Sequence, residues 1–194
     1  TVTAGTINVS TSSTVPAQNI PVNTLNVAIG AFDVDVRGEE ITTAQMVFKV
    51  TIGTTTANTA VGVDDITNVV LVDQNGSVVA GPVDGSAGVT AYGTITFSDT
   101  VTFPVGISTY TLKGKAGTDF ATNDTITAST TPSAWGTVRG LETGNTITPT
   151  PASAISTNAM TVKAQALTVS VSSLPIAQTV ITGSNSFVFA NYIL

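Results

Sequence analysis

The sequence predicts an all-β fold built as a two-sheet sandwich, and three observations lead to that class. Of the 194 residues, 77 are Thr, Val or Ile, whose β-branched side chains fit a pleated sheet better than a helix. Apolar residues alternate with polar ones in several segments, and no segment keeps a helical period for long enough to form a helix. Turn signals divide the chain into roughly nine or ten short strands, a number typical of a sandwich.

Residues 25–36 predict a long strand interrupted by a bulge. Two apolar stripes follow one another there on opposite parities: Leu25, Val27 and Ile29, then Phe32, Val34 and Val36. Because a change of parity requires one extra residue in the strand, we expect a β-bulge at Gly30-Ala31.

Further strands are expected along the rest of the chain. They are the stripe Met46, Phe48, Val50 and Ile52, the run 66–73, the pairs Ile95 with Phe97 and Val101 with Phe103, and residues 109–116, 125–129, 146–148 and 158–164. After the run 66–73, Asn75-Gly76 predicts a type I′ turn into a strand at Val78-Val79, because this dipeptide tolerates the positive φ angles of that turn. Together these strands and turns predict an immunoglobulin-like two-sheet β-sandwich.

The two ends of the chain resemble each other at an offset of 160 residues. Nine of the 34 pairs aligned without a gap are identical, beginning with Thr1-Val2 over Thr161-Val162. Apolar character is also kept where identity fails, as for Phe32 over Tyr192. We interpret this match as a tandem repeat.

The repeat predicts the domain organisation. Residues 1–164 are expected to form one complete sandwich, and residues 165–194 the opening strands of a second, incomplete repeat. The join at residues 160–169 has no Gly, Pro or Ser and reads as nearly continuous strand, so we expect neighbouring units in a nearly fixed orientation. Because the chain begins at Thr1 without a signal-peptide pattern, we expect a processed chain or a piece of a longer one.

The composition excludes several kinds of chemistry. Without His or Cys there is no imidazole base, no thiolate nucleophile and no zinc, haem or iron–sulfur ligand set. Six Lys and Arg against 12 Asp and Glu, a net charge of −6, cannot form the basic surface that nucleic acid requires. The apolar runs are also far shorter than the roughly 20 residues that span a bilayer. We therefore expect no catalytic residue, no nucleic-acid partner and no membrane span in this stretch.

Carboxylates are the remaining candidates for chemistry, and six of the 12 occur in three pairs: Asp33 with Asp35, Glu39 with Glu40, and Asp64 with Asp65. We interpret them as solvated acids that keep a weakly charged surface soluble. The alternative is calcium, which needs only oxygen ligands, at Asp33 and Asp35 or at Asp64 and Asp65. No Asp-x-Asp-x-Asp-Gly run is present, so we expect no cofactor, with calcium as the one exception.

Trp135 and three Asn residues allow contacts with sugars. Trp135 beside Gly136 could stack on a glycan, although a single Trp is more often a packing residue, and we favour packing. Asn8, Asn75 and Asn123 begin Asn-x-Ser/Thr sequons, which permit glycosylation but also arise by chance in a Thr-rich chain.

The chain resembles a known class of bacterial protein. The segment from Val169 to Gln178, followed by Phe187-Val188-Phe189-Ala190, is similar to the start of a repeat in large bacterial cell-surface proteins. Residues 65–73 with their Asn-Gly turn, and residues 103–112, resemble the middle of such repeats. Those proteins carry tandem Ig-like β-sandwich repeats, and some resemble S-layer components. The resemblance implies a structural, surface-exposed role and offers no catalytic residues to carry over.

The distribution of charge favours assembly at the ends. Residues 1–32 carry no charge and residues 143–194 carry only Lys163, so we expect these ends to pack on copies of the chain or on adjacent repeats. We therefore expect a non-enzymatic extracellular structural protein of a surface layer, stalk or pilus-like filament. In a sharper hypothesis, residues 165–194 donate a strand to a neighbour. The expected assembly residues are Leu167, Val169, Val171, Phe187, Phe189, Tyr192 and Ile193.

The alternative function is an adhesin or carbohydrate-binding module with a glycan as its partner. Its binding site would use the loops around Trp135 or the acids near Asp64.

Overall fold

The computed structural model describes residues 5–55, 61–87, 92–163, 170–177, 179–183, 185–186 and 188–193. The chain divides into two compact units, Thr1–Ala164 and Gln165–Leu194, called unit 1 and unit 2 below. The described residues include only two helical segments, the 3-10 turns η1 (Val63–Asp65) and η2 (Pro132–Ala134). None of these described helices is long and apolar enough to cross a membrane.

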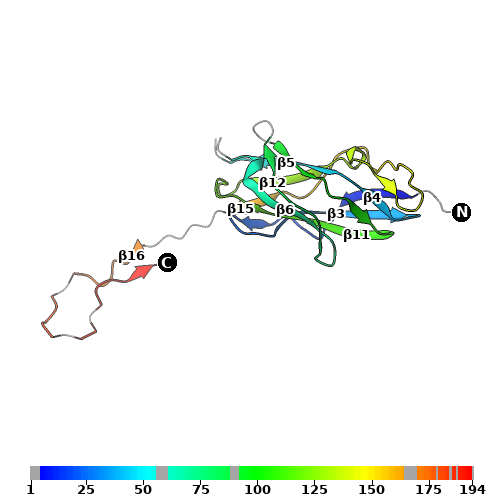
Figure 1. The fold of residues 1–194 in the computed structure, drawn as a ribbon. Helices are drawn as coiled ribbons and strands as arrows, with labels where there is room; N and C mark the ends of the chain where they lie inside the picture. The colour runs from blue at the N-terminus through cyan, green and yellow to red at the C-terminus, as the bar shows by residue number, and fades with distance from the viewer. Residues whose placement is uncertain are drawn as a thin grey trace. The chain divides into compact units, whose positions relative to one another are not determined.

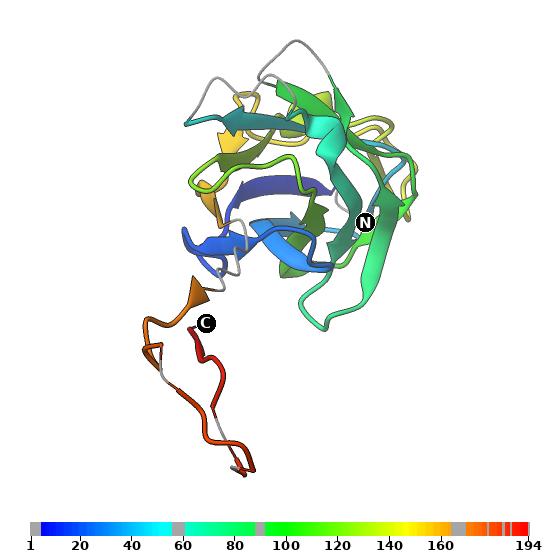
Figure 2. The ribbon, with the colours of Figure 1, turned by 90° about the vertical axis from the view of Figure 1, so that its left-hand side faces the viewer.

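Unit 1 is a two-layer β-sandwich, which confirms the predicted fold class (Figure 1). Sheet A has the order β1-β3-β11-β6-β7, with β1 (Thr6–Thr11), β3 (Val27–Arg37), β11 (Gly106–Ala116), β6 (Ile66–Val72) and β7 (Val78–Val83). Sheet B has the order β2-β15-β12-β5-β9-β8, with β2 (Asn19–Pro21), β15 (Met160–Lys163), β12 (Thr125–Thr130), β5 (Met46–Gly53), β9 (Tyr92–Phe97) and β8 (Ser86–Ala87). Strand β14 (Ile155–Ser156) also pairs with β12. Figure 2 shows the strands of the two sheets facing one another.

A small third sheet lies where β3 ends and β11 begins. Its order is β10-β4-β13, with β10 (Val101–Phe103), β4 (Ile41–Thr43) and β13 (Arg139–Gly140). It occupies this end because β4 follows β3 after a short turn and β10 directly precedes β11.

Alternation of apolar and polar residues builds the core between the two sheets. The four residues of the predicted stripe in β5 are all buried, and so are the predicted pairs in β9 and β10: Met46, Phe48, Val50, Ile52, Ile95, Phe97, Val101 and Phe103. The residues between them in β5 are half-buried or exposed. Period-2 patterning therefore identified the inward face of these strands correctly.

The bulge predicted in β3 lies one residue earlier than expected. Leu112 of β11 lies opposite Gly30, and the next residue, Lys113, lies opposite Ala28. Ile29 is therefore the extra residue, and it is buried. Parity alone predicts that an extra residue exists but not which residue it is.

Gly30 allows the segment after β14 to approach β3. A Cβ at Gly30 would lie 2.4 Å from Cγ2 of Thr157, a distance that no side chain tolerates. Thr157 Oγ1 in turn donates to the carbonyl of Ala128 (3.1 Å) and accepts from its N–H (3.2 Å), which ties this segment to β12. The close approach thus requires glycine at position 30.

The predicted hairpin joins β6 and β7, but its turn is not type I′. Gly76 has a φ of 87°, whereas Asn75 does not have the positive φ that a type I′ turn requires. Asp73 instead organises the turn, because its Oδ1 accepts from the N–H groups of Asn75 (2.9 Å) and Ser77 (2.8 Å). The N–H of Gly76 donates to the carbonyl of Asp73 (3.1 Å), so Gly76 is the left-handed residue that closes a longer loop.

Two further strand predictions are wrong. Leu25 lies outside β3 and is exposed, because Asn23 and Asn26 on either side of it adopt left-handed φ angles of 54° and 59°. Residues 146–148 form no strand; Thr146 makes only an isolated bridge to Arg139.

Unit 2 contains one described strand pair. β16 (Ser170–Val171) pairs antiparallel with β17 (Tyr192–Ile193), so that the first residue of β16 lies opposite the last residue of β17. The N–H of Ser172 donates to the carbonyl of Asn191 (2.7 Å). The Oγ of Ser172 accepts from the N–H of Leu174 (3.1 Å), which turns the chain after β16.

Phe48 provides a test of the core of unit 1. Its ring is buried and contacts Phe32 (ring centroids 5.4 Å apart) and Phe97 (5.9 Å). We expect Phe48→Ala to lower the free energy of unfolding by about 3–5 kcal/mol, measured by urea denaturation. Ile107→Ala, at an exposed position of β11, is the matched control and should change it by less than about 0.5 kcal/mol. Equal effects of the two substitutions would contradict this description of the core.

Candidate assembly site

The predicted assembly residues that the structure describes are exposed. Leu167, Val169 and Phe187 lie outside the described residues. The other four lie in unit 2, with exposed fractions of 67% for Val171, 87% for Phe189, 66% for Tyr192 and 57% for Ile193. The structure brings Val171 and Tyr192 together as a cross-strand pair. Exposed large apolar side chains gathered in a short segment are typical of a surface that contacts protein.

The internal contacts of unit 2 coincide with contacts of unit 1 at the offset of 160 residues. Four contacts match in this way. Two of them are cross-strand pairs. The third is a backbone hydrogen bond (3.0 Å in unit 1), and the fourth is a backbone N–H that donates to a Ser Oγ (3.4 Å in unit 1). The four coincidences are Ser10–Asp33 with Ser170–Ile193, Thr11–Phe32 with Val171–Tyr192, Ser12–Ala31 with Ser172–Asn191, and Thr14–Ser12 with Leu174–Ser172. The strands β16 and β17 therefore have the register of β1 and β3.

Corresponding positions of the two units differ in burial. Phe32 is 2% exposed, because β11 pairs with β3 and Phe48 of sheet B packs on its ring. Tyr192 is its counterpart in unit 2, where β17 pairs with β16 alone among the described residues. Among the described residues, no second strand pairs with β17 and no sheet faces it, and Tyr192 is accordingly exposed.

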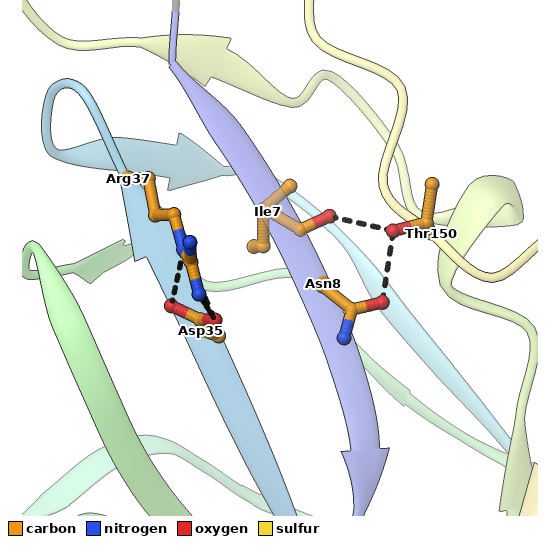
Figure 3. Close-up of polar contacts among 5 residues, drawn as sticks. All are labelled: Ile7, Asn8, Asp35, Arg37 and Thr150. Carbon is orange, nitrogen blue, oxygen red and sulfur yellow. Dashed lines mark hydrogen bonds and ion pairs between the residues drawn. The ribbon is translucent and has the colours of Figure 1, made fainter.

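The outer edge of β1 in unit 1 is already occupied. Thr150 N–H donates to the carbonyl of Ile7 (3.0 Å), and Val9 N–H donates to the carbonyl of Thr150 (2.8 Å). The hydroxyl of Thr150 also donates to the Ile7 carbonyl (3.2 Å) and to Asn8 Oδ1 (2.9 Å), as Figure 3 shows. The backbone groups that a donated strand would use at Ile7 and Val9 are thus already bonded.

The other edges of the two sheets are short or contain proline. β8 has two residues, and β2 has three, of which Pro21 is the last. In β7, Pro82 lacks an N–H and the N–H of Gly81 donates to Asp99 Oδ2 (2.9 Å). Such edges resist strand addition. Among the described residues, the apolar unpaired edge is therefore in unit 2.

The calcium candidates are distributed over two separate places. Asp33 Oδ1 accepts from Thr109 Oγ1 (2.6 Å), and Asp35 forms an ion pair with Arg37 at 2.9 Å (Figure 3). Asp64 and Asp65 lie in η1, where Asp65 Oδ2 accepts from the N–H of Gly62 (2.8 Å). Within the described ranges, no three acidic side chains lie close enough to hold a metal ion. Calcium at these residues stays a prediction.

Glu39 differs from its prediction, because it is a buried carboxylate and not a solvated acid. It is 3% exposed and lies between β3 and β4. Its two oxygens accept from the N–H of Gly5 (3.2 Å), the N–H of Glu142 (2.9 Å), and the N–H (2.8 Å) and hydroxyl (2.7 Å) of Thr143. A Cβ at Gly140 would lie 2.2 Å from the carboxylate, so a larger residue there would displace the Glu39 carboxylate from this position. Glu39 thus ties the start of β1 to the loop after β13.

The donors also control the ionisation of Glu39. The hydroxyl and N–H of Thr143, together with the N–H groups of Gly5 and Glu142, hold the pKa of Glu39 below its ordinary value of 4.5, against the opposing effect of burial. The donors at Glu142 and Thr143 are 103 and 104 residues away in the chain, so no local sequence signal announces them. A glutamate in a short turn before an apolar strand is the only hint.

Asp124 has a similar role at the start of β12. It is fully buried, and its Oδ1 accepts from the N–H (3.1 Å) and hydroxyl (3.4 Å) of Thr55 after β5. Its Oδ2 accepts from the N–H of Ala121 (2.8 Å), and its backbone carbonyl accepts from Val162 of β15 (2.7 Å). Asp124 therefore joins the ends of three strands of sheet B.

Trp135 is a packing residue, as favoured from the sequence. It is 8% exposed, and its ring stacks on Phe103 with centroids 5.8 Å apart. Its Nε1 donates to Thr130 Oγ1 (2.8 Å), which satisfies its one polar group. Trp135 therefore offers no platform on which a sugar ring could stack.

No protein-family model matches the chain, and no curated protein matches it. Among solved structures, AvmM, which catalyses macrocyclization in alchivemycin A biosynthesis, is similar at 10% identity and a TM-score of 0.40, covering 85% of this chain and 91% of that one. Self-complemented MyfA, the major subunit of Myf fimbriae from Yersinia enterocolitica, in complex with galactose, has 14% identity and a TM-score of 0.22 over 81% and 98% of the two chains. A type III cohesin module from the cellulosomal ScaE cell-surface anchoring scaffoldin of Ruminococcus flavefaciens has 7% identity and a TM-score of 0.22 over 84% and 88%. At such low scores these likenesses carry no inference about activity, ligand or assembly.

The pH dependence of stability tests the role of Glu39. A carboxylate with a lowered folded-state pKa stabilises the fold above its unfolded pKa, and this contribution is lost as the pH falls through the folded value. We expect Glu39→Gln to reduce the melting temperature at pH 7, and the difference from wild type to be constant above about pH 5.5 and to shrink below the ordinary pKa of 4.5.

Glu40→Gln is the matched control for this measurement, because Glu40 is adjacent and exposed. Thermal unfolding followed by circular dichroism from pH 7 to pH 3 compares the three proteins. A Glu39→Gln deficit that persists undiminished at pH 3 would rule out the ionised carboxylate as its source.

Proposed function

We propose that this chain is a non-enzymatic structural segment of an extracellular cell-surface layer, stalk or filament, built from tandem β-sandwich repeats. The observation that carries the proposal is the common register of β16–β17 and β1–β3 at the offset of 160 residues. A sequence match between the two ends and a match of their hydrogen bonds are both expected if unit 2 is the start of a second sandwich. Tandem sandwiches joined through a short connection form extended, stiff arrays.

The surface chemistry of unit 1 supports packing against other protein. The outward residues of β12 are Thr125, Thr127 and Ser129, which alternate with buried residues. Only 9% of the chain is charged. Removing hydroxyl groups from water costs less free energy than removing charges, so such faces can be covered at low cost.

A chimera tests the repeat relation directly. Residues 165–194 carrying Ala190→Gly are joined to residues 35–164, so that they replace residues 5–34 of unit 1 and glycine is kept at the position of Gly30, where Thr157 leaves no room for a Cβ. We expect a cooperatively unfolding sandwich in which the amide of Tyr192 is protected from hydrogen exchange, because Tyr192 takes the place of Phe32. Phe189 in place of the buried Ile29 should lower stability by about 1–3 kcal/mol relative to residues 1–164, through overpacking.

A chimera with a scrambled 165–194 segment is the control and should not unfold cooperatively. If the native chimera behaves like the scrambled one, the repeat relation is wrong and the proposed function loses its main support.

Deleting residues 165–194 tests assembly through unit 2. Because the edges of unit 1 are bonded or short, we expect the protein without residues 165–194 to be a folded monomer. Under conditions in which the full chain assembles, electron micrographs of this shorter protein should show no filaments or sheets. Replacing both Tyr192 and Ile193 by Ser is the matched change within the full chain, and it should reduce assembly in the same direction. Assembly that persists in both proteins would show that unit 1 alone is sufficient.

A further inference from the structure

Two of the three Asn-x-Ser/Thr sequons have their side chains engaged in the fold. Asn8 lies in β1, and its Oδ1 accepts from the hydroxyl of Thr150 (2.9 Å). Asn123 precedes β12; its N–H donates to the carbonyl of Val162 (2.8 Å), and its Oδ1 accepts from Nζ of Lys163. Each of these two asparagines therefore holds a neighbouring segment of unit 1 through its amide oxygen.

The third sequon, Asn75-Gly76-Ser77, lies in the turn between β6 and β7. Residues 74–78 are all exposed. The backbone N–H groups of Asn75 and Ser77 donate to Asp73 Oδ1, so the turn is fixed through its backbone. Among the described residues, the side chains of Asn75 and Ser77 make no hydrogen bond or ion pair. Both side chains of this sequon are therefore available from solvent.

The space around this turn can hold an additional bulky group. A Cβ at Gly76 would meet no atom within 4 Å. Beside the turn is an open groove of about 370 Å³, in which Val72 is the one apolar side chain. Hydroxyl, amide and charged side chains line the rest of it: Thr14, Asp73, Gln74, Thr109, Thr111 and Lys113. These groups can form hydrogen bonds with the hydroxyls of a sugar.

We propose that Asn75 is a glycosylation site and carries an N-linked glycan; this inference rests on the extracellular location in the proposed function. In the reaction, Nδ2 of Asn75 attacks the anomeric carbon of a glycan held on a lipid diphosphate. The bond from that carbon to the diphosphate oxygen breaks, and the lipid diphosphate leaves with the electron pair. One proton of Nδ2 passes to a base of the transferase. Ser77 supplies the hydroxyl that the sequon requires.

The location of Asn75 explains why the fold tolerates this modification. A glycan at the tip of a turn interrupts no strand pairing and displaces no buried side chain. At Asn8 or Asn123 the same group would compete with the contacts to Thr150 or Lys163. The structure therefore favours Asn75 over the other two sequons.

Mass spectrometry of the protein isolated from the cells that make it tests the proposal. Trypsin places the three sequons in separate peptides, because Asn75 lies in residues 50–113, Asn123 in residues 116–139, and Asn8 in the peptide that ends at Arg37. The amidase that releases N-glycans converts glycosylated Asn to Asp, and in heavy-oxygen water the new oxygen is labelled. We expect the label at Asn75 and none at Asn8 or Asn123.

A sample kept in heavy-oxygen water without the amidase is the control for spontaneous deamidation of Asn75-Gly76. Equal labelling with and without the amidase would overturn the proposal. An unlabelled 50–113 peptide would overturn it too, as would equal labelling of all three sequons.

Three variants produced in the same cells make the test specific. Asn75→Gln and Ser77→Ala should each abolish the label, whereas Ser77→Thr keeps the hydroxyl and should retain it. Both positions are exposed, so we expect all three variants to fold like the wild type. A label that persists in Ser77→Ala would contradict attachment through the sequon.

Labelling of intact cells separates failure of this inference from failure of the proposed function. A membrane-impermeant lysine reagent, applied to a second sample, reports whether the chain is on the cell surface, and Lys49 is an exposed target. If lysines are labelled but Asn75 is unmodified, the glycan inference alone fails. If no lysine is labelled, the chain is not on the surface and the proposed function fails with it.

Discussion

Coverage of β3 is the constraint on which the rest of unit 1 depends. Its apolar residues can be buried only when both edges are paired and a second sheet faces them, and β1, β11 and β5 meet those three needs. The bulge at Ile29 and the glycine at position 30 adjust β3 so that the segment at Thr157 closes the side of the sandwich. Among the described residues of unit 2, β17 is covered only by β16, the counterpart of β1. The apolar side chains of β17 are therefore exposed.

Two buried carboxylates hold the ends of the sandwich in a chain with few charges. Glu39 and Asp124 each accept hydrogen bonds from backbone N–H groups and from a Thr hydroxyl, and each joins segments far apart in the sequence. Charge-assisted bonds are stronger than neutral ones, so one buried acid can organise a loop that offers several unpaired N–H groups. The scarcity of charge on this chain therefore does not mean that charge is unimportant to its fold.

The features predicted correctly from the sequence are those encoded by neighbouring residues. Alternation within β5 identified its buried face because strand geometry imposes a period of two. The bulge lies at Ile29 and not at Gly30-Ala31, because the register with β11 determines which residue is extra. The turn at Asn75 is not type I′, because the side chain of Asp73 organises it. The burial of Glu39 depends on partners about a hundred residues away, and no local pattern carries that information. For the candidate assembly site, the 160-residue offset identified which residues of the two units correspond. Which strand edge has no partner among the described residues could be read only from the strand order of the sheets.

The differences between corresponding positions of the two units say more about which strands fit each unit than the identities do. Where unit 1 has Thr11 and Asp33, unit 2 has Val171 and Ile193, so two polar side chains that bond within the complete sandwich become apolar. A neighbouring strand that offers hydrogen bonds at these places would leave its own polar groups unpaired on unit 2, which disfavours it. Replacing polar residues by apolar ones at corresponding strand positions therefore changes which strand fits without changing the register. In an array of similar sandwiches, this difference would direct each strand to its own unit instead of to the neighbouring one.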